Sequence, residues 1–319
     1  MIDEHTTGHK AQFMSVTEYA ADRARTGFRI LPSGPGTFWI GFGFGAMMRI
    51  PIFHLVPPTS DELQHVLWHG PATVASYLME PDECHPANTW LYLCTDQTYA
   101  LEKLAPEMRR NVRRGLRELT IAPLTYDQLL AHGDQAFCDT RRRVGLKDGT
   151  LEEFHQRFTT QRLPEVALLG AWKDTQLAGF LSITQVDDWA DITGNFSMDA
   201  LREYRPSDTL VYSALSHYLV ERKCRLVTYT MSSIEADSNA AGLHRYKKKV
   251  GFEARPVHRA FVPHPLLRPL ANRLTLWGVN TALRFMPGDL RLKKASGVLA
   301  SMHGGTRLVE VAAKSTSHE

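Results

Sequence analysis

The sequence predicts an α/β protein in which helices flank mixed central sheets and a helical segment forms the C-terminal tail. Three observations support this fold class. From Val166 onward the predicted elements follow the order β-β-β-α-β-α-β, and helical patterns alternate with loops before that point. Hydrophobic residues make up 43% of the 319 residues and charged residues 22%, which excludes wholesale disorder and fibrous architectures.

The first half of the chain is interrupted by Gly and Pro. Their concentration in residues 30–70 predicts loops and turns. Within this stretch Gly41-Phe-Gly43-Phe-Gly45-Ala46 formally fits a dinucleotide-binding fingerprint, but Pro51 would cut short the helix that such a site needs, so we expect a tight turn. The other elements predicted here are a helix starting at Ser60, a strand at 90–95, a helix over Tyr99–Leu119 with a second segment from Pro106, and helices at Asp127–Leu130 and Leu151–Phe158.

In the second half of the chain, predicted strands, turns and helices follow one another more regularly. A hairpin is predicted from two apolar runs separated by Asp174-Thr-Gln, and Asp187-Asp188 marks the next turn. The predicted elements are strands at Val166–Trp172, Leu177–Val186 and Ala190–Met198, a helix at Asp208–Arg222, a strand at Leu226–Met231, a helix at Asn239–Lys249 and a strand at Phe252–Val262.

Two stretches are suited to anions. Arg109, Arg113 and Arg117 recur at i, i+4 and i+8, which predicts an electropositive helix stripe that fits phosphates or carboxylates. The alternative is a solvated basic face neutralised by acids elsewhere. Residues 202–210 run from a loop into a helix N-terminus, where free amides bind anions and Arg202 and Arg205 add charge. Alternatively, Ser207 or Asp208 is simply the N-cap.

The order of these elements resembles the GNAT superfamily of N-acetyltransferases, and most closely its Fem-like branch of FemAB and peptidoglycan-bridge acyltransferases. The motifs that carry the resemblance are Arg205-Pro-Ser-Asp-Thr-Leu210, Tyr246-Lys247-Lys-Lys-Val-Gly251 and the Arg-rich Arg109-Arg110-Asn-Val-Arg113-Arg114, and it covers roughly residues 90–263. It implies two GNAT-like lobes: a diverged N-terminal lobe at 1–160 with the Arg-rich helix, and a C-terminal lobe at 161–263. A basic amphipathic helical tail at 264–319 follows.

The resemblance implies an N-acyltransferase that moves an acyl or aminoacyl group from a CoA thioester or a charged tRNA to an amine by direct attack, without a metal. Tyr246 would donate a proton to the leaving group, and Asp191 and Asp199 are base candidates, although each could equally be a turn or surface acid. The residues implied for donor binding are Arg202, Arg205, Ser207, Thr209, Asn239 and Lys247, with Arg109, Arg113 and Arg117 for a substrate anion.

The sequence departs from the superfamily pattern in two places. Arg202-Glu-Tyr-Arg-Pro-Ser207 lacks the glycines of the usual pyrophosphate loop, and Thr228-Tyr229-Thr230 stands where many Fem-like chains have an Asp. The alternative function is therefore a catalytically inactive Fem-like fold that acts as a binding module.

The tail carries the positive charge of the chain. Residues 264–319 have a net charge of +5, and the remaining residues have −2. Leu270, Leu274 and Trp277 begin a wide apolar helix side that Arg273 and Arg284 interrupt. Two partners remain open for this side: the protein's own first lobe, or an anionic membrane with Trp277 at the interface.

The N-terminus indicates location. Asp3 and Glu4 with no apolar run after them argue against a secretory signal, and no run of 18 apolar residues occurs. We expect a cytoplasmic protein, with peripheral contact to the inner membrane face as the alternative. The expected partner is a small-molecule or lipid-linked amine acceptor, and nucleic acid only if the donor is aminoacyl-tRNA.

Overall fold

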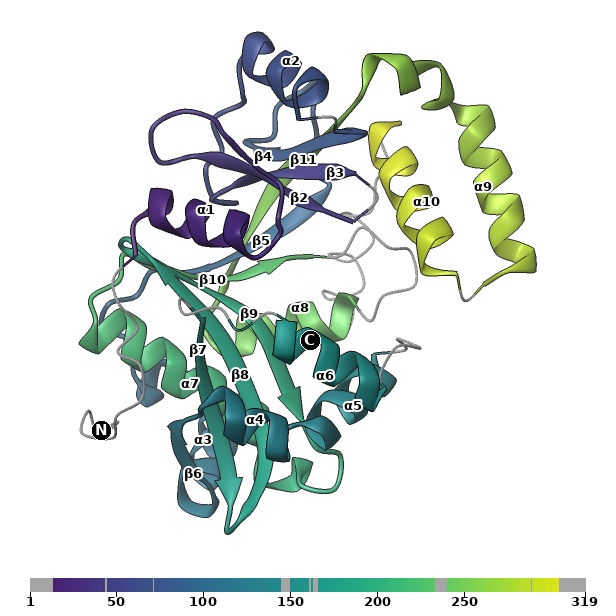
Figure 1. Ribbon diagram of the computed structural model, residues 1–319. Coiled ribbons are helices and arrows are strands. Elements are labelled where there is room, and N and C mark those ends of the chain that lie inside the picture. Colours follow the sequence, from purple (N-terminus) through teal and green to yellow (C-terminus); the bar gives the residue numbers. More distant parts are fainter. Residues whose placement is uncertain are drawn as a thin grey trace. The chain divides into compact units, whose positions relative to one another are not determined.

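The computed structural model describes residues 14–43, 45–70, 72–144, 150–160, 162, 166–232, 240–287 and 289–303 (Figure 1). The chain separates into two compact units, each assembled from separated segments. Unit 1 comprises Met1–Tyr19, Tyr92–Thr230 and Arg245–Glu253, and unit 2 comprises Ala20–Leu91, Met231–His244 and Ala254–Glu319. These units interleave along the chain, and the sequential division into lobes at 1–160 and 161–263 stays a prediction.

Unit 1 is built on a mixed sheet with the strand order β5-β10-β9-β8-β7-β6. The pairs β6–β7, β7–β8 and β8–β9 are antiparallel, whereas β10 runs parallel to β9. Asp174 and Asp187 adopt positive φ in the two tight turns that connect β7, β8 and β9. The strands are β5 (Thr89–Cys94), β6 (Thr120–Pro123), β7 (Val166–Lys173), β8 (Gln176–Val186), β9 (Trp189–Ser197) and β10 (Leu226–Met231).

Helices pack on the sheet of unit 1. A cluster of phenylalanines, Phe137, Phe154, Phe158, Phe180 and Phe196, joins α5 and α6 to β8 and β9. Local sequence signals start these helices, since Pro106 occupies the first turn of α3 and Thr125 forms a capping box with Gln128 at α4. The helices are α3 (Pro106–Glu118), α4 (Tyr126–His132), α5 (Asp134–Arg143), α6 (Leu151–Thr160) and α7 (Pro206–Leu215), with a π-helical turn at Ser216–Glu221.

Unit 2 contains a second sheet with the order β1-β2-β3-β4-β11, in which β3 and β4 are parallel and the other pairs are antiparallel. Trp39, Met47 and Ala75 from the sheet pack against Val66 and Leu67 of α2. The strands are β1 (Ile30–Pro32), β2 (Phe38–Phe42), β3 (Ala46–Ile50), β4 (Val74–Met79) and β11 (Glu253–Pro263), and the helices are α2 (Ser60–Trp68), α9 (Arg273–Phe285) and α10 (Leu290–Met302). α1 (Val16–Arg25) and α8 (Ala240–Lys249) contribute residues to both units, and so does β5, whose residues 89–91 belong to unit 2.

The fold class and every element predicted from Val166 to Val262 are confirmed, with ends that differ by a few residues. The sequence predicts only loops, turns and one helix in residues 30–70, but they contain β1, β2 and β3; Gly41 and Phe42 end β2, and Ala46 starts β3. The strands β4 and β6 and the helices α1 and α5 are also absent from the sequence prediction. α2 starts at Ser60 as predicted, and Thr59 is its N-cap, because the Thr59 hydroxyl accepts from the Glu62 amide.

Candidate functional site

The pairing between β9 and β10 ends early, and Asp191 lies where it ends. The parallel register joins Leu226–Thr228 to Trp189–Asp191, although β9 continues to Ser197. At this point the Asp191 carboxylate accepts hydrogen bonds from the Thr228 hydroxyl and, at 3.5 Å, from the Thr230 amide. Thr230 has a φ of 51°. The Thr230 amide of β10 thus donates to the Asp191 side chain instead of to a backbone carbonyl of β9. The two strands separate here, at a place that we name the β9–β10 junction.

Lys247 of α8 brings a buried ammonium group to this region of unit 1. Only 1% of Lys247 is exposed, and its Nζ donates to the Tyr229 carbonyl at 2.6 Å. The ammonium lies 4.1 Å from the ring centroid of Tyr92 and 4.5 Å from that of Tyr229. Burial lowers the pKa of Lys247 to about 7, and the negative charge of Asp191 opposes this shift. Near neutral pH this amine can therefore both bind and release a proton.

Tyr246, the preceding residue, points its hydroxyl at the N-terminal turn of α7. The hydroxyl donates to the Ser207 carbonyl at 3.2 Å. Burial raises the pKa of Tyr246 well above its usual value, and the neighbouring Tyr229 and Asp208 act in the same direction. Tyr246 is therefore a neutral phenol at neutral pH, which is the form that can donate a proton.

Asp208 is a half-buried carboxyl in the same turn. It accepts from the Asn111 amide at 3.1 Å, and burial raises its pKa while Arg205 opposes the shift. α7 begins at Pro206 without a side-chain cap, so neither Ser207 nor Asp208 serves as the N-cap, and Arg205 takes that position with a φ of 63°. The first amides of a helix have no acceptor within it, so this turn can bind an anion.

Thr209 is predicted to contact the donor, but the structure places it inside unit 1. It is fully buried, its hydroxyl donates to the Arg205 carbonyl at 2.9 Å, and it packs against Gly115 of α3. Its surroundings make Thr209 a helix-packing residue, and we leave it out of the proposed site.

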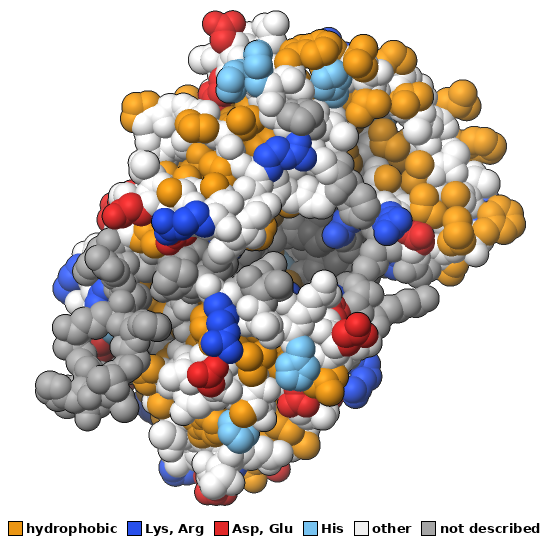
Figure 2. All heavy atoms as spheres, viewed as in Figure 1, with side chains coloured by type: hydrophobic (Ala, Val, Ile, Leu, Met, Phe, Trp, Pro, Cys, Tyr) orange, Lys and Arg blue, Asp and Glu red, His pale blue; other side chains and the backbone are white. Residues whose placement is uncertain are grey.

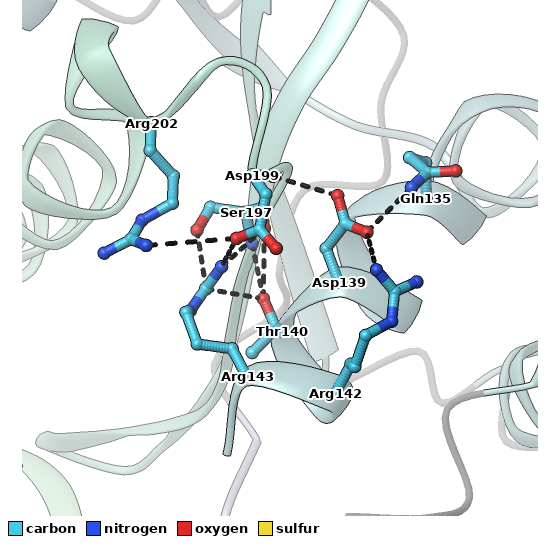
Figure 3. A network of polar contacts seen from close by, with 8 residues as sticks. All are labelled: Gln135, Asp139, Thr140, Arg142, Arg143, Ser197, Asp199 and Arg202. Atoms are coloured by element: carbon cyan, nitrogen blue, oxygen red, sulfur yellow. Dashed lines mark hydrogen bonds and ion pairs between the residues drawn. The ribbon is translucent and has the colours of Figure 1, made fainter. Parts of the chain in front are cut away.

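Asp199 belongs to an ionic network at the end of β9 (Figure 3). Its carboxylate pairs with Arg143 and, at 4.0 Å, with Arg202, and its amide donates to Asp139 at 2.9 Å. Figure 3 shows Arg142 and Gln135 holding Asp139 from α5. The ion pair with Arg143 and the bond to Asp139 join α5 to the end of β9 through Asp199. Arg202 is likewise engaged here.

The arginines of α3 line an open hollow of about 450 Å³ together with Pro106. Arg109 is partly engaged in the fold, since its guanidinium donates to the carbonyls of Glu102 and Leu104 at 2.8 and 3.1 Å. Arg114 pairs with Glu203 at 3.3 Å and Arg117 with Glu118 at 3.1 Å. Arg113 is exposed and forms no ion pair among the described residues. The stripe is thus partly neutralised, with Arg113 available to an anion.

The structure groups Asp191, Tyr246 and Lys247 with partners that sequence reasoning missed: Tyr92, Asn111, Asn195, Asp208 and Tyr229. The predicted donor-binding residue Asn239 lies outside the described residues. In the part of the chain that is described, no three His, Cys, Asp or Glu side chains gather as potential metal ligands.

Comparison with solved structures identifies the fold. FemX matches with a TM-score of 0.51 and 10% identity, covering 79% of this chain and 92% of FemX. The C-terminal DUF2156 domain of a proposed lysylphosphatidylglycerol synthetase from Agrobacterium fabrum has a TM-score of 0.47 and 17% identity, over 76% of this chain and 86% of that domain. A tandem GNAT protein from the clavulanic acid biosynthesis pathway has a TM-score of 0.41 and 11% identity, over 72% of this chain and 78% of that protein's chain. No family model and no curated protein matches the sequence. The chain has a GNAT/Fem-like fold.

Proposed function

We propose that this protein is an N-acyltransferase that moves an acyl or aminoacyl group from a CoA thioester or a charged tRNA to an amine by direct attack. The observation that carries the proposal is the pair of adjacent side chains Tyr246 and Lys247, a neutral phenol and a buried amine with a pKa of about 7, beside the β9–β10 junction. The FemX likeness supports the fold, while the chemistry rests on these residues.

The donor would bind along β9 beyond Asp191. There the β9 edge has parted from β10, and an extended arm that carries amides can add to such an edge by backbone hydrogen bonds. The phosphates at the other end of a CoA molecule would meet the first turn of α7, where Ser207 supplies an amide and Arg205 a positive charge. Arg113 and Arg117 on the α3 stripe would hold a further anionic group of donor or acceptor.

The transfer needs two proton movements. As the acceptor nitrogen bonds to the acyl carbon, it loses a proton, and Lys247 in its neutral form would take it. The carbon–sulfur bond of a thioester, or the ester bond of a charged tRNA, then breaks, and Tyr246 would give its proton to the leaving atom. Asp191 is a positioning residue here, because it holds Thr228 and Thr230 and balances the charge of Lys247. Asp199 takes no part in this scheme.

The acceptor would be a small-molecule or lipid-linked amine. Nucleic acid becomes a partner only if the donor is aminoacyl-tRNA, in which case the α3 arginines would contact its phosphates.

The experiment screens acetyl-CoA, longer acyl-CoAs and charged tRNA for a rise in melting temperature, then measures transfer from the donor that binds. Tyr246→Phe should lower turnover by about 10²–10⁴-fold with little change in donor affinity, because only the proton donor is lost. Tyr204→Phe is the matched control, since it removes a tyrosine hydroxyl elsewhere in unit 1. Full turnover in Tyr246→Phe would refute the role of Tyr246, and binding without transfer across the panel would indicate a binding module instead.

A further inference from the structure

α9 and α10 form a helix pair in unit 2 whose inner side is already used. Leu276, Val279 and Leu283 of α9 are half-buried, while its outer side chains remain exposed. The Ser296 hydroxyl of α10 donates to the Asn280 side chain at 2.7 Å. The inner side of α9 therefore has its partner in α10, and only the outer side needs an explanation.

The outer side of α9 is apolar and uncovered. Leu274, Trp277 and Phe285 are 76%, 67% and 82% exposed, and their spacing places them on one stripe of the helix. The 3-10 turn before α9, Pro265–Leu270, extends this surface with Leu266, which is 73% exposed, and Leu270. Figure 2 shows hydrophobic side chains gathered over α9. A contiguous apolar surface of this kind is uncommon on a protein without a partner for it.

Basic residues accompany the apolar stripe. Arg273 lies four residues before Trp277 and Arg284 seven residues after it, so both arginines share the side of the helix that Trp277 occupies, and both are exposed. From residue 264 to residue 303 the sequence has six Lys or Arg and one acidic residue, Asp289. The Asp289 carboxylate is engaged as the N-cap of α10, where it accepts from the Arg291 and Leu292 amides.

This combination fits one kind of occupant. A second copy of the chain would bring the arginines of two identical stripes against one another, which costs electrostatic free energy. An anionic bilayer instead offers apolar chains to Leu274 and Phe285, an interface to Trp277 and negative headgroups to the arginines. α9 has 13 residues and spans about 20 Å, so it would lie in the surface; no helix among the described residues is long and apolar enough to cross a membrane.

We propose that the outer side of α9, with the turn before it, is a peripheral membrane-binding surface that docks the protein on anionic lipid. This goes beyond acyl transfer and does not depend on it, because binding to lipid can be measured without any donor or acceptor.

The test floats the full-length protein with vesicles of phosphatidylcholine alone, and with vesicles that also contain phosphatidylglycerol. Each is measured at about 0.1 M and about 1 M salt, between which the screening length falls from about 10 Å to about 3 Å. We expect the protein to float with the anionic vesicles, to bind them more weakly at high salt, and to bind phosphatidylcholine least.

Two variants separate the apolar and the charged contributions. Leu274→Ser, Trp277→Ser and Phe285→Ser combined should lower the partition coefficient more than about tenfold at both salt concentrations. Arg273→Gln with Arg284→Gln should lower it about fivefold per charge, at low salt only. The control combines Val56→Ser, Val144→Ser and Leu151→Ser, which are also exposed apolar residues but lie elsewhere, and it should bind as the wild type does.

The proposal is overturned if the wild type does not float with anionic vesicles, or if the triple α9 variant floats as well as the wild type. It also fails if the wild type sediments as a dimer that the triple variant dissociates while neither binds vesicles, since the surface then joins two copies of the chain. Because the three side chains are mostly exposed, the variant should melt at the wild-type temperature. If it melts lower, Trp277→Ser alone replaces it.

Discussion

Lys247 links the candidate site to the pH dependence of folding. Burial lowers its pKa from 10.5 to about 7 in the folded protein. Between these two values the unfolded chain carries a proton that the folded protein lacks, so the free energy of unfolding rises with pH, by up to about 1.4 kcal/mol per pH unit. Below about pH 7 both states are protonated, and the cost of burying the charge is fully present. We predict that Lys247→Met removes this pH dependence.

The measurement is urea unfolding of the wild type and of Lys247→Met across pH 6 to pH 10. As pH rises above about 7, the free energy of unfolding of the wild type should increase relative to that of Lys247→Met. The exposed Lys248 gives the control Lys248→Met, whose curve should run parallel to the wild type. Parallel curves for Lys247→Met as well would mean that Lys247 titrates normally in the folded protein.

The sequence motifs pointed to Tyr246 and Lys247, but not to the residues that change their acidity. Tyr92 and Tyr229 surround the Lys247 ammonium from two strands, and they are far from it along the chain. Asn111 reaches Asp208 from α3. Such contacts depend on how strands and helices assemble, which no local pattern contains. For the same reason the sequence left Asp191 and Asp199 as equal candidates, and only their hydrogen-bond partners separate them.

At the scale of elements, α3 and α7 approach one another closely at Gly115. A Cβ at this position would overlap the Thr209 hydroxyl and lie 3.1 Å from the Tyr204 carbonyl. We predict that Gly115→Ala lowers the free energy of unfolding by about 1–3 kcal/mol, although alanine is the better helix former, because the overlap outweighs that gain. Thermal and urea unfolding measure the effect.

Two further variants make this test specific. Gly278→Ala is the matched control, because Gly278 also lies within a helix but has nothing within 4 Å of its added Cβ, so it should stabilise by up to about 1 kcal/mol. Combining Gly115→Ala with Thr209→Ala removes the hydroxyl that the new methyl group meets. The double variant should therefore recover part of the free energy of unfolding that Gly115→Ala loses. If Gly115→Ala behaves like Gly278→Ala, the two helices are not in close contact there.

The predictability of the elements followed the strength of their patterns. β7 to β10 are runs of buried and β-branched residues between clear turns, so their positions could be predicted from the sequence. β1 to β3 have three to five residues each, and Gly and Pro surround them. The sequence pattern therefore indicates turns more strongly than these short strands. α9 was predicted as an amphipathic helix, but the sequence could not tell which side would be covered, because α10 supplies the inner contact.

At the scale of the whole molecule, strands distant in sequence are paired within each unit. β6 pairs with β7 across residues 124–165, and β4 pairs with β11 over more than half of the chain. A cut at residue 160 therefore separates β6 from β7 in unit 1, and β1 to β4 from β11 in unit 2. We predict that residues 1–160 and 161–319, expressed separately, do not fold, because each fragment leaves sheet edges and apolar faces without their partners.

Circular dichroism and resistance to proteolysis would measure folding, and co-expression of the two fragments should recover a folded complex. A chain that ends at residue 263 is the matched comparison. It keeps every strand of both sheets and loses only α9, α10 and the residues around them, so it should fold. If 161–319 folds alone, the lobes are sequential domains, as the family resemblance implies. If the chain ending at 263 does not fold, the outer surface of α9 belongs to a helix pair that the rest of unit 2 requires.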